Sequence, residues 1–202
     1  MADLSRLEQI HDFLILTDRF KQVVRQNYLT DGSRRETDAE HTWHMALYAL
    51  LLKDELGVEV DIGRTLALIL VHDLVEIYAG DTFAYDDVGR ADQEEREREA
   101  AAKLFGMLPP DLRDRVDSWW REFEEGRTNE ARFARALDRL QAFGQNVVSR
   151  GKSWHEHGVT RARTFGRMNE ALESDPAIRA LVERLYRRAD TEGSWVAEPA
   201  GT

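Results

Sequence analysis

The sequence predicts a single domain built almost entirely of α-helices, and three observations carry this expectation. Apolar residues recur at helical spacing over most of the chain. The four prolines, at positions 109, 110, 176 and 199, lie outside the long periodic segments. No segment shows the apolar–polar alternation of a strand, and no internal repeat is visible. A chain of 202 residues has the length of one domain and buries roughly 70% of the surface that its unfolded form exposes.

Apolar stripes and capping residues place the helices of the first half of the chain. The first helix carries leucine and isoleucine side chains on one stripe, and a polar loop over residues 28–37 follows it. Gly57 stands at the C-cap of the second helix, Asp61 is a suitable N-cap for the third, and Gly80 follows the third helix. Three helices are therefore expected, over residues 4–24, 39–56 and 62–78.

Proline and charge patterns place the helices of the second half, after a loop over residues 81–87. Pro110 suits the first turn of a helix, and Asp175 followed by Pro176 is a cap and first turn for another. Helices are expected over residues 93–105, 110–124, 128–149 and 176–188. Residues 191–202 have little periodicity, so we expect a loosely ordered tail there.

Composition excludes several classes of function. The chain has no cysteine, so disulfides, thiolate catalysis and zinc fingers are excluded, and any metal must be held by His, Asp, Glu or backbone oxygen. With 38 acidic against 28 basic residues the net charge is −10, which argues against nucleic acid or an anionic membrane as partner. The longest apolar run, residues 45–52, is too short to span a bilayer. The first residues carry no secretory signal, so a cytoplasmic location is expected.

Ionisable side chains interrupt the most apolar helix of the chain. His72, Asp73 and Glu76 lie in its second half, where nearly every face should be buried. A buried carboxylate without a partner is costly, and a metal cation compensates that cost directly. His41, at the start of an apolar stripe, and Asp138, beside one, add two further ligand types. A structural hydrogen-bond cluster is the alternative for His72, Asp73 and Glu76, but the whole set favours a metal site.

These residues resemble a known signature. His41, then His72 with Asp73, then Asp138 resemble the H…HD…D pattern of the HD-domain metal-dependent phosphohydrolases. The stretches 39–44, 72–82 and 131–140 resemble the 5′-deoxynucleotidase branch, which is related to the oxetanocin-type HD hydrolases. The likeness extends over about residues 5–150. It implies a single HD-domain helical bundle of roughly seven to nine helices over residues 1–190, followed by the tail.

The resemblance implies a metal-dependent hydrolase. His41, His72, Asp73 and Asp138 would bind one divalent metal, and their mixed nitrogen and oxygen set suits Mn, Co, Fe, Ni or Zn better than Mg. Dinuclear relatives carry additional histidines before the last aspartate, and this chain has none between His72 and His155. The implied reaction releases phosphate from nucleoside 5′-monophosphates, with 2′-deoxynucleosides favoured, and the implied assembly is a homodimer.

The resemblance also assigns roles beyond the metal ligands. Glu76 and Asp81 match the two catalytic carboxylates of the family, and the sequence leaves open which is acid and which is base. Arg19 would bind phosphate as a planar fork, Phe20 would pack near the sugar, and Thr82 would contact substrate. Relatives carry tryptophan where this chain has Phe20, which puts strict exclusion of the ribose 2′-hydroxyl in doubt.

Two other functions stay open at this stage. One is an HD hydrolase of nucleoside triphosphates or modified nucleotides, for which a basic cluster such as Arg34 and Arg35 would have to reach the outer phosphates. The other is a non-catalytic HD domain that binds nucleotide without turnover. The retained metal-ligand set and Glu76 argue against the second, and failure to bind metal would favour it.

Overall fold

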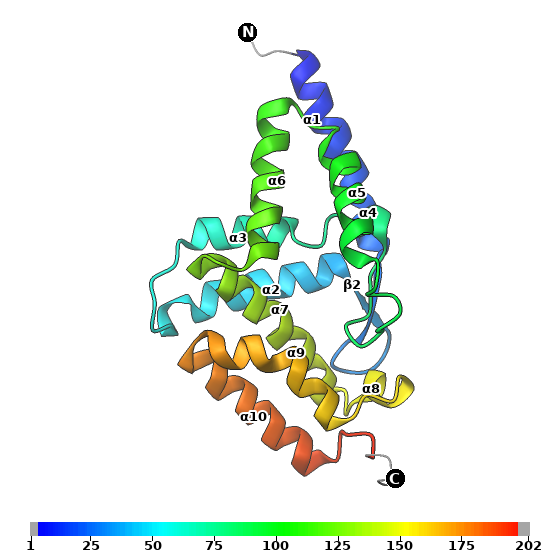
Figure 1. Ribbon diagram of the computed structural model, residues 1–202, viewed down its shortest axis with the longest axis vertical. Coiled ribbons are helices and arrows are strands. Elements are labelled where there is room, and N and C mark those ends of the chain that lie inside the picture. The colour runs from blue at the N-terminus through cyan, green and yellow to red at the C-terminus, as the bar shows by residue number, and fades with distance from the viewer. Residues whose placement is uncertain (1–3, 198–202) are drawn as a thin grey trace.

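The computed structural model describes residues 4–197, and over this range it confirms the all-α class (Figure 1). In chain order the elements are α1 (Leu4–Thr17), the 3-10 turn η1 (Asp18–Gln22), β1 (Val24–Tyr28), β2 (Arg35–Thr37), α2 (Asp38–Leu52), η2 (Lys53–Glu55), α3 (Ile62–Val71), α4 (Glu76–Ala79), α5 (Gln93–Phe105), α6 (Pro110–Glu125), α7 (Asn129–Val148), α8 (Lys152–Glu156), α9 (Arg161–Ser174) and α10 (Pro176–Glu192). Among these described helices none is both long and apolar enough to cross a membrane.

Helix α7 runs through the middle of the molecule and packs against α2, α3, α6, α9 and α10 (Figure 1). Its Leu137 and Leu140 belong to the larger apolar core. A second apolar cluster joins α1, α5, α6 and the end of α3, with Leu104 and Phe105 fully buried in it. Burial of such side chains supplies most of the folding free energy, at about 25 cal/mol per Å² of apolar surface. Residues of both clusters line the cavity described below, so the site lies where they meet.

The beginning of the chain differs from the expected helix over residues 4–24. Helix α1 ends at Thr17, and β1 then pairs antiparallel with β2 in a short hairpin that the residue pattern does not indicate. The turn between the strands includes Gly32 at a φ of +70°, a conformation that glycine adopts without strain. Strands of five and three residues are too short for alternation to be recognised in a sequence, and their pairing is a tertiary contact.

The expected helix over residues 62–78 is interrupted between Val71 and Glu76, at His72 and Asp73. Helix α3 ends at Val71, a tight turn covers residues 72–75, and α4 begins at Glu76. In this turn the amides of Leu74 and Glu76 donate to the carbonyls three residues earlier instead of four. The break keeps Val71 and Val75 in the apolar core while Asp73 and Glu76 line the cavity.

The C-terminal part is more ordered than the residue pattern indicates. Helix α9 is not among the expected helices, although Thr160 caps its first turn by accepting from the amide of Arg163. Helix α10 continues to Glu192, so the boundary expected at residue 191 falls inside a helix. Ser194 is buried, and Trp195 stacks on Trp154 with ring centroids 4.7 Å apart. The tail is therefore packed as far as residue 197, and residues 198–202 lie outside the described range.

Candidate metal centre

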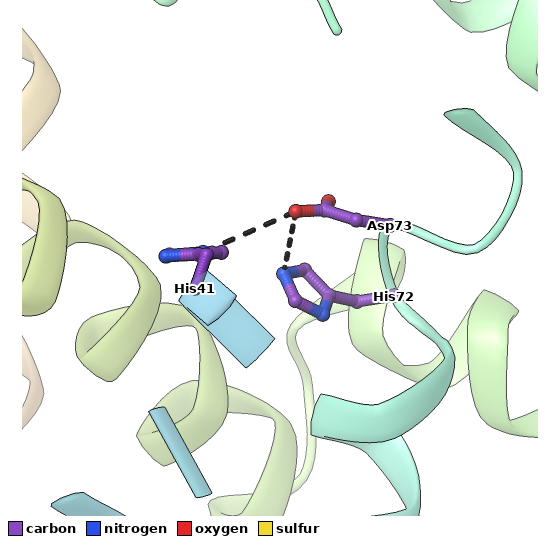
Figure 2. Close-up of side chains that lie close together, drawn as sticks. All are labelled: His41, His72 and Asp73. Atoms are coloured by element: carbon purple, nitrogen blue, oxygen red, sulfur yellow. Dashed lines mark ion pairs between the residues drawn. The ribbon is translucent and has the colours of Figure 1, made fainter. Parts of the chain in front are cut away.

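Three separate segments bring the four expected metal ligands together. His41 comes from the first turns of α2, His72 and Asp73 from the turn after α3, and Asp138 from the middle of α7. Figure 2 shows both imidazole rings beside one carboxylate oxygen of Asp73. The Asp73 Oδ2 atom lies 3.0 Å from His72 Nε2 and 3.9 Å from His41 Nε2. His41 Nε2 is also 3.2 Å from Asp138 Oδ1.

The hydrogen bonds of the His72 ring leave its Nε2 atom available for a metal. The Nδ1 atom of His72 lies 2.7 Å from the carbonyl of Ile69, which only accepts, so Nδ1 is the donor. His72 Nε2 is buried and has no hydrogen-bond partner, although a carboxylate oxygen faces it. A ring nitrogen lone pair that faces a carboxylate oxygen needs a cation or a proton between them. Two imidazoles and two carboxylates in this arrangement fit a divalent metal.

The electrostatics of the ligands agree with a cation site. Burial disfavours a charged ring, but the nearby Asp73 and Asp138 outweigh it and raise the pKa of His72 to about 9. Burial alone would raise the pKa of Asp138, yet its close contact with His41 and the charge of Arg167 hold it well below its ordinary value. The negative potential that draws a proton to His72 would equally draw a metal cation.

Arg25 enters this site although nothing in the residue pattern marks it. Its Nη1 atom donates to Asp73 Oδ2 at 2.8 Å and to Asp38 Oδ1 at 3.0 Å, and its Nη2 atom is 3.9 Å from Asp138 Oδ1. The guanidinium thus touches two of the expected metal ligands. Arg25 lies on strand β1, and the hairpin that β1 forms with β2 places its side chain at the site. The residue pattern does not indicate this hairpin. Asp38, fully buried at the start of α2, is a second site residue that sequence reasoning missed.

Two carboxyls next to the expected metal ligands, those of Glu76 and Asp81, have pKa values above the ordinary range. Burial and the charges of Asp73 and Asp38 raise the pKa of Glu76 well above its ordinary value. The pKa of Asp81 is raised to about 6, chiefly because the carboxyl is buried. The charge of Arg25 lowers this pKa, whereas the charges of Asp38 and Asp73 raise it further. One buried oxygen of Glu76 and one of Asp38 have no hydrogen-bond partner in the described part of the chain. Such groups are suited to general acid–base catalysis.

Three of the expected ligands, His72, Asp73 and Asp138, line a cavity of about 890 Å³, which falls in the size range of small-molecule sites. Glu76, Asp81 and Thr82 line it, together with aromatic side chains such as Phe83 and Tyr85. Arg167 of α9 also lines it and donates to Asp138 Oδ2 at 3.2 Å. Because the residue pattern does not reveal α9, it does not reveal Arg167 as a site residue either.

The remaining expected substrate contacts lie in different surroundings. Thr82 lines the cavity, and its hydroxyl accepts a hydrogen bond of 3.1 Å from Arg96 Nη2. Arg19 is exposed on η1, and Phe20 is buried there. Neither Arg19 nor Phe20 is among the residues that line the cavity. The structure therefore does not bring these two residues to the ligands.

Comparisons with known proteins agree with this geometry. A family model described as the HD domain matches residues 17–179. The 5′-deoxynucleotidase HDDC2 of Homo sapiens is 32% identical over 182 residues, which cover 89% of this chain and 85% of the relative. The protein of that name from Bos taurus is 34% identical over 192 residues, covering 93% and 89%. A solved structure of a predicted metal-dependent phosphohydrolase from Magnetospirillum magnetotacticum has 44% identity and a TM-score of 0.90, covering 96% of this chain and 97% of that one.

Proposed function

The chain belongs to the HD domain family, and from this premise we propose that it is a metal-dependent phosphomonoester hydrolase of nucleoside 5′-monophosphates, with 2′-deoxynucleotides preferred. The observation that carries the proposal is the convergence of His41, His72 and Asp73, with Asp138 beside His41, next to a nucleotide-sized cavity that His72, Asp73 and Asp138 line. The relatives named 5′-deoxynucleotidase support the substrate class and the preference for the deoxy sugar.

His41, His72, Asp73 and Asp138 would hold one divalent transition metal. Such an ion polarises a phosphoryl group and lowers the pKa of a water molecule beside it. Glu76 and Asp81 line the cavity next to these ligands and hold protons at a pH where ordinary carboxyls have lost them. They are the two groups placed to orient the attacking water and to return a proton to the 5′-oxygen that leaves.

Arg25 and Arg167 would receive the phosphate oxygens. Both guanidiniums lie at the metal ligands, from β1 and α9 respectively, and both line the cavity. Planar guanidinium groups bind phosphate through paired, charge-assisted hydrogen bonds. A phosphomonoester at this place would thus be neutralised by two side chains of this chain.

A substrate panel tests the proposed function. We expect the metal-loaded protein to release inorganic phosphate from 2′-deoxyadenosine 5′-monophosphate, to do so more slowly from adenosine 5′-monophosphate, and to leave the deoxynucleoside triphosphate intact. Release of triphosphate from the last compound would instead support the HD triphosphate hydrolase. Tight nucleotide binding without turnover of any of the three would support the non-catalytic binding domain.

Replacing Arg25 with glutamine should weaken substrate binding. Loss of one charge-assisted hydrogen bond costs about 1.5–3 kcal/mol, so we expect KM for the monophosphate to rise roughly 10- to 150-fold. Steady-state phosphate release measures this. Arg188→Gln, a surface residue paired with Glu192, is the matched control and should leave KM unchanged. Arg19→Gln measured beside them tests the exposed arginine that the family resemblance implicates. An unchanged KM in Arg25→Gln would contradict the proposal that Arg25 binds the phosphate of the substrate.

The quaternary structure and cellular location stay proposals as well. We expect a homodimer, and the exposed apolar side chains Trp43, Leu47, Leu50 and Leu51 on α2 supply a surface suited to one. A cytoplasmic location and the absence of a nucleic-acid partner remain predictions from the sequence.

A further inference from the structure

Two buried side chains, Gln141 and Glu36, form a chain of contacts that begins at the Nδ1 atom of His41. Its Nδ1 atom lies 2.6 Å from the carbonyl oxygen Oε1 of Gln141 on α7. The amide nitrogen Nε2 of Gln141 in turn donates to Glu36 Oε1 at 2.9 Å, from strand β2. His41 is 0% exposed, and Glu36 and Gln141 are each 1% exposed, so water cannot substitute for any of these contacts.

Glu36 decides which way the Gln141 amide faces. A carboxylate only accepts hydrogen bonds, so the donating end of the amide must turn toward Glu36. A second acceptor, Nδ1 of His44, lies 3.2 Å from the same amide nitrogen. The reversed amide would place its carbonyl against the Glu36 carboxylate and lose both contacts. The carbonyl end of Gln141 therefore faces His41.

The orientation of the Gln141 amide determines which ring nitrogen of His41 carries a proton. A neutral imidazole carries one proton, and a carbonyl beside Nδ1 requires that proton to be on Nδ1. Glu36 Oε2, 3.8 Å from the same nitrogen, favours a proton there as well. Nε2 is then left with its lone pair, facing Asp73 and Asp138. His72 differs, because its Nδ1 partner is a backbone carbonyl that cannot reverse.

We propose that Glu36 and Gln141 are positioning residues that fix His41 as the Nδ1–H tautomer and thereby hold its Nε2 ready to bind the metal. The inference rests on the proposed function only in taking His41 as a metal ligand. Neither residue lines the cavity. Partners of this kind behind a metal-bound histidine typically contribute about 10- to 100-fold to metal affinity.

Glu36→Gln is the principal test, because it keeps the volume of the side chain and removes only the fixed acceptor. In the variant the Gln141 amide is free to reverse, so His41 should populate both tautomers. We expect ¹⁵N-edited NMR of metal-free protein to show Nδ1 of His41 fully protonated in wild type and only partly protonated in the variant. Zn²⁺ affinity, measured by competition with a chelator, should fall about 10-fold or more.

Two further variants separate positioning from packing. Gln141→Met keeps a similar volume but removes the acceptor at Nδ1, so it should weaken Zn²⁺ binding to a similar degree. Gln145→Met is the matched control: Gln145 donates to the same Glu36 oxygen at 2.6 Å but does not touch His41, so Zn²⁺ affinity should stay within about 2-fold. Far-UV circular dichroism and Tm verify that each variant is folded.

The inference is overturned if His41 stays entirely Nδ1–H in the Glu36→Gln variant, or if Gln145→Met weakens Zn²⁺ binding as much as Gln141→Met does. These measurements contain no nucleotide. Failure of the substrate panel above would therefore leave their outcome unchanged, and their failure would leave the nucleotidase proposal to be judged on its own assay.

Discussion

Asp138→Asn should deprive the protein of its metal and of nearly all activity. The substitution keeps the shape of the side chain but removes the charge that faces His41 Nε2 at 3.2 Å. In Asp138 the Oδ2 atom accepts a hydrogen bond from Arg167. In one of the two orientations of the asparagine amide, an NH2 group would take the place of this oxygen and could not accept that bond. Because, under the proposed function, a bound metal would activate the water and polarise the phosphate, we expect phosphate release to fall on the order of 1,000-fold.

Metal content is the accompanying measurement for this variant. After dialysis against equal concentrations of Mn²⁺, wild type should retain metal and Asp138→Asn should retain little. Asp114→Asn is the matched control, since Asp114 pairs with the neighbouring Arg113 on the surface of α6 and neither residue lines the cavity. An Asp138→Asn protein that keeps wild-type metal content and activity would show that α7 does not contribute a ligand.

Glu76→Gln should separate catalysis from metal binding. Removing a group that transfers a proton in the transition state costs typically about 10²- to 10⁴-fold in rate, and we expect kcat to fall within that range. Metal content should be retained, because His41, His72, Asp73 and Asp138 remain intact. The neutral amide also relieves a buried carboxyl crowded by Asp73 and Asp38, so the variant should be at least as stable as wild type.

A neighbouring glutamate controls for the exchange of a carboxyl for an amide in the cavity. Glu97 lines the same cavity from α5 and is hydrogen-bonded to Gln93. Glu97→Gln makes the same exchange at a residue without a role in proton transfer, so kcat should change little. Equal loss of kcat in both variants would mean that Glu76 acts only through the electrostatic potential. Loss of metal from Glu76→Gln would mean that Glu76 is a ligand.

The sequence predicted well those features that depend on local residue patterns. Helices α5, α6 and α7 begin and end within a residue or two of their expected limits, because their caps and apolar stripes are continuous. The order His41, His72–Asp73 and Asp138 indicated a metal site because ionisable side chains inside apolar stripes are costly unless a cation compensates their burial. In the structure His41, His72 and Asp73 lie close enough to share a metal ion, and Asp138 Oδ1 lies 3.2 Å from His41 Nε2.

Features that depend on contacts between distant segments could not be predicted. The hairpin that aims Arg25 at the site is a pairing of two very short strands. The contact between Glu36 and Gln141 joins residues 105 positions apart. Helix α9 buries only Thr164, Met168 and Ala171, and a stripe with a single long apolar side chain is a weak helix signal. The break after Val71 arises because the ionisable side chains face a cavity that the neighbouring helices create.

A titration of chelator-stripped protein with Mn²⁺ tests most directly whether these four residues form a catalytic metal centre. Bound metal and phosphate release from 2′-deoxyadenosine 5′-monophosphate would be measured on the same samples. We expect no release without metal, release that rises in proportion to bound Mn²⁺, and a plateau at one ion per chain. Full release from stripped protein, or bound metal with no release at any ratio, would contradict the central claim.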